Sequence, residues 1–332
     1  MPAPEKSSNH AARPCELTQA EIRRLVESLN SLQDGELAVD ALIGCGQTAI
    51  PPLREFLLHG RPSVIYQPRQ RAVRALAELG AKEVLVEYLR QRKLIADAAL
   101  RFGEEAVENT AARALAAWKT DDVLQVLLRV ARARKLPGVI EALGQFGRPE
   151  AIPYLIAALG DDVARRDAEH GLRTMGQAAR AELIEAARTP DPSRREESPA
   201  SLARRRSALR ILVSLPATAK TWSELQFLLR EEDADMAVSA AGLALRIGTD
   251  GDKEFAVQQL IRFLAGANWL LQSEIEGHLL EYFPVAASAI DREIQQRSQF
   301  PASQQAKDAT LRILLNVLRQ ARGHGAQNTL KG

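Results

Sequence analysis

Small apolar residues recur along the chain in short segments that each end in glycine or proline. Clear copies lie at 41–46, 75–80, 142–147 and 171–176, and weaker copies lie at 211–216, 243–248 and 279–284. A further segment, 114–119, fits the series without its glycine. Successive copies are roughly 30–40 residues apart, which is the period of stacked helix pairs. The pattern therefore predicts an array of helical repeats.

Each copy leads into a second apolar helix, which is clearest at 150–159. Ile152, Leu155 and Leu159 recur there at helical spacing, so one face of this helix is apolar. Because the first helix of each copy is also rich in small apolar residues, the two helices can pack against each other and against the next pair.

Proline and glycine punctuate these pairs at fixed places. Pro153 falls in the first turn of a second helix, where its missing N–H costs little, and Pro51 has the same place in an earlier copy. Gly80, Gly147 and Gly176 stand where a first helix ends, and glycine readily takes the left-handed conformation required there. Each unit is therefore expected to be a helix, a tight glycine turn and a second helix.

Capping signals and loop composition indicate the ends of the array. Thr18 with Glu21 predicts a capping box before an N-terminal helix, and Thr221 with Glu224 predicts a second box. Pro301 precedes one long apolar helix that is expected to end near Gly323.

Two longer connections interrupt the pattern, an insertion at 59–70 and a proline-rich, charged segment at 189–201 that is expected to be mobile. Whether that segment is a hinge or only an insertion stays open. The predicted organisation is a flexible tail at 1–16, a first solenoid half at 17–188, a mobile loop at 189–201, a second half at 202–322 and a tail at 323–332.

These repeats resemble the HEAT family, and in particular the short HEAT-like repeats of phycobilin lyase subunits. The resemblance is best from Glu36 to Arg188 and looser from Arg204 to Arg297. It implies an all-α fold, an α-solenoid or superhelix of about eight HEAT-like helix pairs with capping helices at both ends. It also implies that the second helix of each pair lines the concave side. The resulting candidate binding face is Glu87, Arg90, Gln125, Arg129, Tyr154, Gln258 and Arg262, with Arg132 one helical turn from Arg129.

Composition favours helix and gives no overall charge signal. The 332 residues are 46% hydrophobic and 26% charged, and the formal net charge is +2, so no global field favours a nucleic acid or a membrane surface. Cys15 and Cys45 cannot form a disulfide framework, the first residues contain no apolar secretory segment, and no stretch is long enough to cross a membrane. We expect a cytoplasmic protein with no membrane partner.

Candidate catalytic chemistry is sparse. The histidines are isolated, and the chain has no His-Glu dipeptide of the kind that binds iron in helical-repeat deoxyhypusine hydroxylases. No zinc-ligand spacing and no phosphate-binding glycine loop is present. Acidic pairs such as Glu104-Glu105 are expected at turns and helix ends, where they complement helix dipoles. We therefore expect no catalytic residue, no metal and no cofactor.

Basic clusters keep a second function open. One comprises Arg129, Arg132, Arg134 and Lys135, and the other comprises Arg194, Arg195, Arg204, Arg205 and Arg206. Arginines gathered on one face could hold phosphates. The tryptophans, Trp118, Trp222 and Trp269, are expected to pack between helices rather than to stack on bases.

The leading hypothesis is a non-enzymatic scaffold that binds a protein or peptide on the concave face. The alternatives are nucleic-acid binding through a basic patch and an enzyme subunit similar to the phycobilin lyases. The identity of the partner and the oligomeric state stay open, because a fold does not dictate a function.

Overall fold

The structure, a computed structural model, describes residues 17–91, 93–191, 197–305 and 307–328, and these residues form helices joined by turns, with no β-strand among them. The chain divides into two compact units. The N-terminal unit comprises Met1–Ala158 and Asp162–Thr174, and the C-terminal unit comprises Leu159–Asp161 and Met175–Gly332. This division falls earlier in the chain than the predicted boundary at 189–201.

The N-terminal unit is a stack of antiparallel helix pairs behind one extra helix. After α1 (Gln19–Ser28), the pairs are α2 (Gly35–Gly44) with α3 (Ile50–His59), α4 (Gln67–Glu78) with α5 (Lys82–Arg90), α6 (Ala98–Leu115) with α7 (Asp121–Ala133), and α8 (Pro137–Phe146) with α9 (Ile152–Ala158). Helix α10 (Arg165–Met175) follows. The expected all-α solenoid of helix pairs is confirmed.

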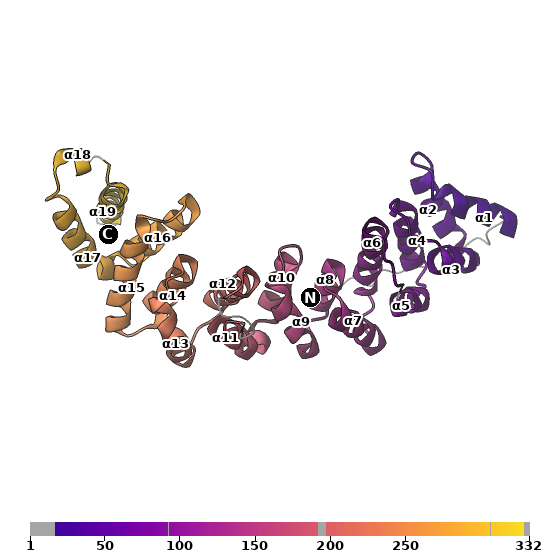
Figure 1. Ribbon diagram of the computed structural model, residues 1–332, viewed down its shortest axis with the longest axis horizontal. Coiled ribbons are helices and arrows are strands. Elements are labelled where there is room, and N and C mark those ends of the chain that lie inside the picture. Colours follow the sequence, from indigo (N-terminus) through magenta and orange to yellow (C-terminus); the bar gives the residue numbers. More distant parts are fainter. Residues whose placement is uncertain (1–16, 92, 192–196, 306, 329–332) are drawn as a thin grey trace. The chain divides into compact units, whose positions relative to one another are not determined.

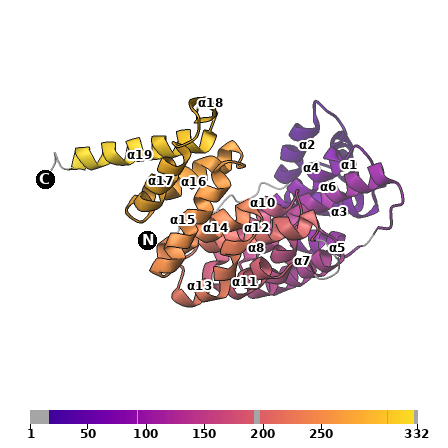
Figure 2. The same cartoon turned by 60° about the vertical axis from the view of Figure 1, so that its left-hand side comes forward.

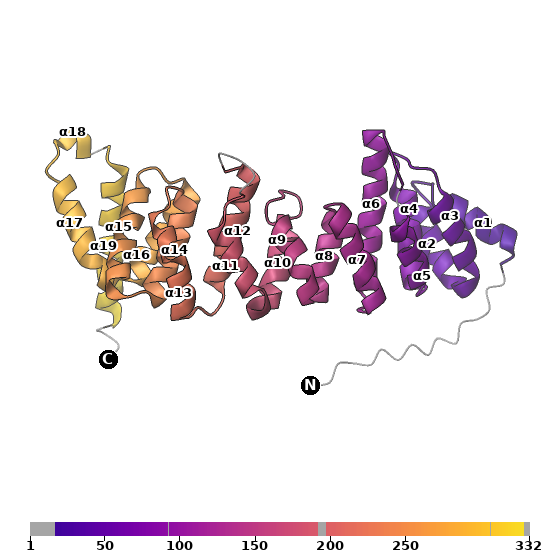
Figure 3. The ribbon, with the colours of Figure 1, turned by 60° about the horizontal axis from the view of Figure 1, so that its bottom comes forward.

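The helices of this unit form two rows. The first helices, α2, α4, α6 and α8, pack on one another in chain order, and the second helices, α3, α5, α7 and α9, form the other row (Figure 1). Helix α1 packs against α2 and α3, as expected of a helix that shields the end of a stack. Figure 3 shows that α6 extends beyond its neighbours α4 and α8.

Glycine and proline act at the places that the sequence predicts. The φ angles of Gly80, Gly147 and Gly176 are 72°, 64° and 56°, so each lies in the left-handed region where a first helix ends. Pro51 and Pro153 lie in the first turns of α3 and α9. The helix–turn–helix unit inferred from the repeats is therefore confirmed in detail.

One predicted capping box is confirmed and the other is wrong. The Glu21 amide donates to the Thr18 hydroxyl at 3.3 Å, and the Thr18 amide donates to the Glu21 carboxylate at 2.7 Å. The helix that Thr221 was predicted to cap begins earlier than expected, because the Thr218 hydroxyl caps it and accepts from the Thr221 amide at 3.2 Å. Thr221 is instead buried inside that helix.

The C-terminal unit repeats the same architecture. It consists of α11 (Arg180–Arg188), α12 (Pro199–Ser214), α13 (Ala219–Leu225), α14 (Ala234–Ile247), α15 (Asp250–Leu264), α16 (Trp269–Glu281), α17 (Phe283–Arg297), α18 (Ala302–Gln305) and α19 (Ala309–Asn328). Helix α12 packs on α11 and α14, and α14 packs closely on α15. Helix α19 lies against α16 and α17, where it closes the stack (Figure 2).

The long helix expected after Pro301 is α19, and the short helix α18 lies between Pro301 and α19. Asp308 separates α18 from α19, and its carboxylate accepts from the Leu311 amide at 3.0 Å, which caps α19. Helix α19 then continues to Asn328, beyond the expected end near Gly323.

The segment at 189–201 belongs to the C-terminal unit, and its last residues, from Pro199, already form the start of α12. Residues 192–196, like the predicted tail at 1–16, lie outside the described residues. On either side of that gap, the Asp191 amide donates to the Ser201 hydroxyl at 2.9 Å, and Ser201 is buried. The described residues before that gap therefore contact α12.

Charged side chains lie in the core of the N-terminal unit. Arg69 and Glu104 are only 5% and 3% exposed, and the buried Tyr88 hydroxyl donates to Glu104 at 2.7 Å. Glu104 was expected at a turn or helix end. It lies instead in the second turn of α6, buried against Arg69 in the first turn of α4.

Candidate binding groove

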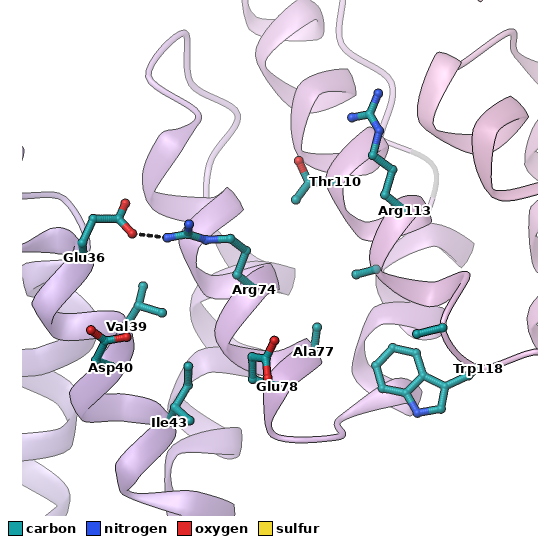
Figure 4. A pocket seen from close by; sticks show the side chains of 12 residues that line it. Glu36, Val39, Asp40, Ile43, Arg74, Ala77, Glu78, Thr110, Arg113 and Trp118 are labelled. Carbon is teal, nitrogen blue, oxygen red and sulfur yellow. Dashed lines mark hydrogen bonds and ion pairs between the residues drawn. The ribbon is translucent and has the colours of Figure 1, made fainter. Parts of the chain in front are cut away.

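A groove of 740 Å³ lies on the row of first helices in the N-terminal unit, across α2, α4 and α6. Figure 4 shows its side chains on these three neighbouring helices. The groove is lined by Glu36, Val39, Asp40, Ile43, Arg74, Ala77, Glu78, Thr110, Arg113, Ala114, Ala117 and Trp118. Its volume falls within the range of proteins' ligand pockets, about 300–1,000 Å³.

Helical spacing places one wall of the groove on α2. Glu36, Asp40 and Ile43 follow one another at intervals of one helical turn, so they share a face. Leu42, which points away from this face, is fully buried against the stack. The same short helix thus contributes both to the core and to the groove.

Small side chains make the hollow. Ala77 on α4 lies between the wall formed by α2 and the wall formed by α6. Ala114 on α6 and Ala117, just after α6, form part of the second wall. Because a methyl group fills little space, the surface is indented at these positions. Trp118, just after α6, supplies a large half-buried aromatic ring at one end.

Ion pairs hold the rim on the α2 side. Glu36 accepts from Arg74 across the groove and from Arg71 at 2.9 Å. Arg71 also donates to the carbonyl oxygens of Leu29 and Ser31, both at 2.8 Å, which anchors its guanidinium. Hydrogen bonds from Arg74 and Arg71 lower the pKa of Glu36 below its ordinary value, so this carboxylate is ionised at neutral pH.

The rim on the α6 side is fixed in the same way. Arg113 donates to Glu141 on α8 at 2.5 Å. The Thr110 hydroxyl accepts from Gln70 of α4 at 2.9 Å and donates to the Ala106 carbonyl at 3.0 Å. These contacts tie three successive first helices together, so the walls of the groove are preorganised.

The face predicted from the sequence lies elsewhere in the fold. Its N-terminal members, Glu87 and Arg90 on α5, Gln125, Arg129 and Arg132 on α7, and Tyr154 on α9, belong to the row of second helices. None of them lines the groove. Gln258 and Arg262 lie on α15 in the other unit.

The side chains of that predicted face differ in their surroundings. Glu87 is held by Arg54 of α3 in a two-pronged ion pair, with the closest contact at 2.6 Å. Arg90 and Arg129 are exposed, and Tyr154 is half-buried. Arg262 donates to Gln259 on its own helix at 3.2 Å. The prediction that these residues form a binding face stays a prediction.

Several arginines of the two basic clusters are committed to carboxylates. Arg134 makes a bidentate pair with the buried Glu108, at 2.6 and 2.8 Å. Arg205 is 3% exposed and donates to Glu197 at 2.8 Å and to Glu231 at 2.6 Å.

Arg206 likewise pairs with Asp233 and Asp235. Arg194 and Arg195 lie outside the described residues. Arg129 and Arg132 remain exposed on α7, so the described part of the basic surface is smaller than the sequence indicated.

The tryptophans take three different positions. Trp222 is buried and its indole donates to Asp252 at 2.8 Å, as expected of a ring packed between helices. Trp118 lines the groove. Trp269 is 78% exposed at the start of α16, so the expectation that it packs between helices is wrong.

No helix formed by the described residues is both apolar enough and long enough to cross a lipid bilayer. Among the same residues, no three His, Cys, Asp or Glu side chains converge as a metal site would require.

Comparison with known protein families gives a match to one part of the chain. Residues 97–173 match the family described as HEAT repeats, a stretch that covers α6 to α9 and most of α10. No curated protein matches the chain. The match and the stacked pairs together support a HEAT-repeat fold, whereas the likeness to phycobilin lyase subunits stays a prediction.

Proposed function

We propose that this chain is a non-enzymatic protein-binding scaffold, and that its N-terminal unit holds a peptide segment of a partner protein in the groove across α2, α4 and α6. HEAT repeats commonly form protein-binding scaffolds, and residues 97–173 match that family. The observation that carries the proposal is the groove itself, which has a hollow apolar floor inside a rim of ion pairs.

The chemistry of the groove fits a peptide. Val39, Ile43 and Ala77 offer apolar contact, while Thr110 and the charged rim offer polar contact at the edges. Specific interfaces have this arrangement, with an apolar centre and a polar rim. Because the walls are held by contacts between helices, binding orders few side chains of the scaffold, and little of the affinity is lost to that ordering.

A second candidate face is the row of second helices, with Arg90, Gln125, Arg129, Arg132 and Tyr154. These residues lie on α5, α7 and α9, and none of them lines the 740 Å³ groove. Exposed Arg129 and Arg132 also keep nucleic-acid binding as the alternative function, with fewer free arginines than the sequence indicated.

Affinity capture with matched variants tests the proposal. Ala77→Trp fills the groove, and Ala157→Trp, on an exposed position of α9, adds the same side chain to the row of second helices. Nuclease-treated lysate is passed over each form of the protein, and far-UV circular dichroism verifies that each is folded. We expect a discrete protein partner that Ala77→Trp loses and Ala157→Trp keeps.

Two other results would change the proposed binding site or the proposed class of ligand. A partner that survives Ala77→Trp and is lost in Arg129→Glu with Tyr154→Ala places the binding face on the second helices. Nucleic acid as the retained ligand, with binding that falls steeply as salt rises, favours the alternative function.

A further inference from the structure

The groove contains two carboxylates that the fold does not use. Asp40 on α2 and Glu78 at the end of α4 line it and are exposed. Among the residues that the structure describes, neither side chain has a hydrogen-bond or ion-pair partner. The other charges of the groove differ in this respect, because Glu36 is paired with Arg74, and Arg113 is paired with Glu141.

The uncompensated charge of the groove is therefore negative. Its lining contains three carboxylates, those of Glu36, Asp40 and Glu78, but only two arginines, Arg74 and Arg113, and each arginine is already paired with a carboxylate. The carboxylates of Asp40 and Glu78 remain without a partner among the described residues. A ligand that enters here meets an acidic surface although the chain as a whole carries a formal charge of +2.

The indole ring of Trp118 lies at the same end of the groove as Asp40 and Glu78. Figure 4 shows Glu78 between Asp40 and Trp118, with the Trp118 indole ring beside the hollow. The face of an indole attracts a cation, and tryptophan does so more strongly than tyrosine or phenylalanine. Carboxylates and an indole face therefore favour the same kind of ligand group.

We infer that the segment bound in this groove is basic and amphipathic. Its lysine or arginine side chains lie at the end formed by Asp40, Glu78 and Trp118, and its apolar side chains lie over Val39, Ile43 and the alanines. This inference rests on the proposed function and specifies the partner's chemistry. An acidic segment is disfavoured, because like charges facing each other across an interface oppose association.

Neutral isosteres separate the charge from the shape. Asp40→Asn with Glu78→Gln removes both free carboxylates without changing the volume of the groove. The matched control is Glu55→Gln with Glu182→Gln, which removes two exposed carboxylates on α3 and α11 and changes the net charge equally. All four positions are exposed, so both double variants are expected to keep the thermal stability of the wild type.

Peptide selection is the experiment. Random 16-residue peptides displayed on phage are selected on the immobilised full chain, and peptides that also bind Ala77→Trp are discarded. We expect the remaining peptides to be enriched in lysine and arginine. A labelled representative should bind the wild type and the control equally, bind Asp40→Asn with Glu78→Gln at least tenfold more weakly, and lose affinity as salt rises.

The outcomes distinguish the two proposals. One contrary result is that the selected peptides bind only the open groove and yet are neutral or acidic. Another is that they bind the double variant Asp40→Asn with Glu78→Gln as tightly as the wild type. Either result contradicts the inference that the bound segment is basic, but it still supports a peptide-binding groove. If no selected peptide distinguishes the wild type from Ala77→Trp, the groove is not a peptide site and both proposals fall.

Discussion

Arg69 and Glu104, on α4 and α6, form a two-pronged ion pair in the core of the N-terminal unit. The second contact, from Arg69 Nη2 to Glu104 Oε1, measures 3.0 Å, and the same nitrogen donates to the Leu57 carbonyl at 2.9 Å. Lys93 adds a contact to Glu104 at 3.2 Å. The pair therefore joins three helices and the connection after α5.

Loss of the Glu104 charge should destabilise the N-terminal unit strongly. Glu104→Gln leaves the buried Arg69 without its counter-charge, and breaking a buried pair in this way costs about 3–5 kcal/mol. Urea unfolding followed by far-UV circular dichroism measures the loss. Glu105→Gln, at the half-buried neighbour, is the control, and a similar small effect for both variants would refute the importance of the pair.

The contribution of Glu104 should also depend on pH. Burial opposes its ionisation, but the hydrogen bond and charge of Arg69, with Tyr88 and Lys93, bring its pKa below the ordinary value. A folded pKa below the unfolded one stabilises the fold above the unfolded pKa, and that stabilisation is lost as pH falls through the folded pKa.

We therefore expect the difference in free energy of unfolding between the wild type and Glu104→Gln to be constant from about pH 7 to about pH 5 and to shrink below about pH 4. Denaturant titrations across this range measure it. A difference that grows towards acid pH would show that ionised Glu104 does not stabilise the fold.

Close packing of two glycines predicts a cost for added methyl groups. Gly144 on α8 and Gly171 on α10 face each other, and a Cβ on Gly171 would lie 2.7 Å from the Gly144 Cα. Gly171→Ala should therefore destabilise the N-terminal unit by about 1–3 kcal/mol, although alanine favours helix.

Gly277 on α16 is the matched control for this substitution, because an added Cβ there meets no atom within 4 Å. Gly277→Ala should stabilise the protein by about 0.5–1 kcal/mol. Thermal melts of the two variants should move in opposite directions, and a stabilised Gly171→Ala would contradict the close approach.

Arg205 should contribute to stability rather than to ligand binding. It donates to Glu197, Glu231 and the Ala187 carbonyl, the last at 3.0 Å. Arg205→Ala should cost about 2–3 kcal/mol, as expected for hydrogen bonds to charged groups. Arg210→Ala, at an exposed position of the same helix, should stay within about 0.5 kcal/mol of the wild type in urea unfolding. An equal loss of stability in Arg205→Ala and Arg210→Ala would contradict the structural role of Arg205.

Local rules predicted the repeats well. Gly80, Gly147 and Gly176 terminate first helices, and Pro51 and Pro153 begin second helices, because these conformations are determined by the residue itself. The capping prediction at Thr221 failed because Thr218 offers an equivalent hydroxyl one helical turn earlier. Packing against neighbouring helices determines which of two such threonines caps the helix.

The groove could not be predicted in the same way. Its position depends on which row of helices leaves space uncovered, and this depends on contacts between repeats that are far apart in sequence. Ala77 and Ala114 belong to segments whose small side chains indicated packing, and they turn out to line a hollow. Glu104 was misplaced for a similar reason, since its partner Arg69 is on another repeat.

Hydrogen–deuterium exchange with and without a selected peptide tests the central claim most directly. If the N-terminal unit binds a peptide in the groove, saturating peptide should slow exchange in 36–43, 74–78 and 110–118, and this protection should be absent in Ala77→Trp. Protection confined to α5, α7 and α9 would contradict the claim and place the binding face on the row of second helices.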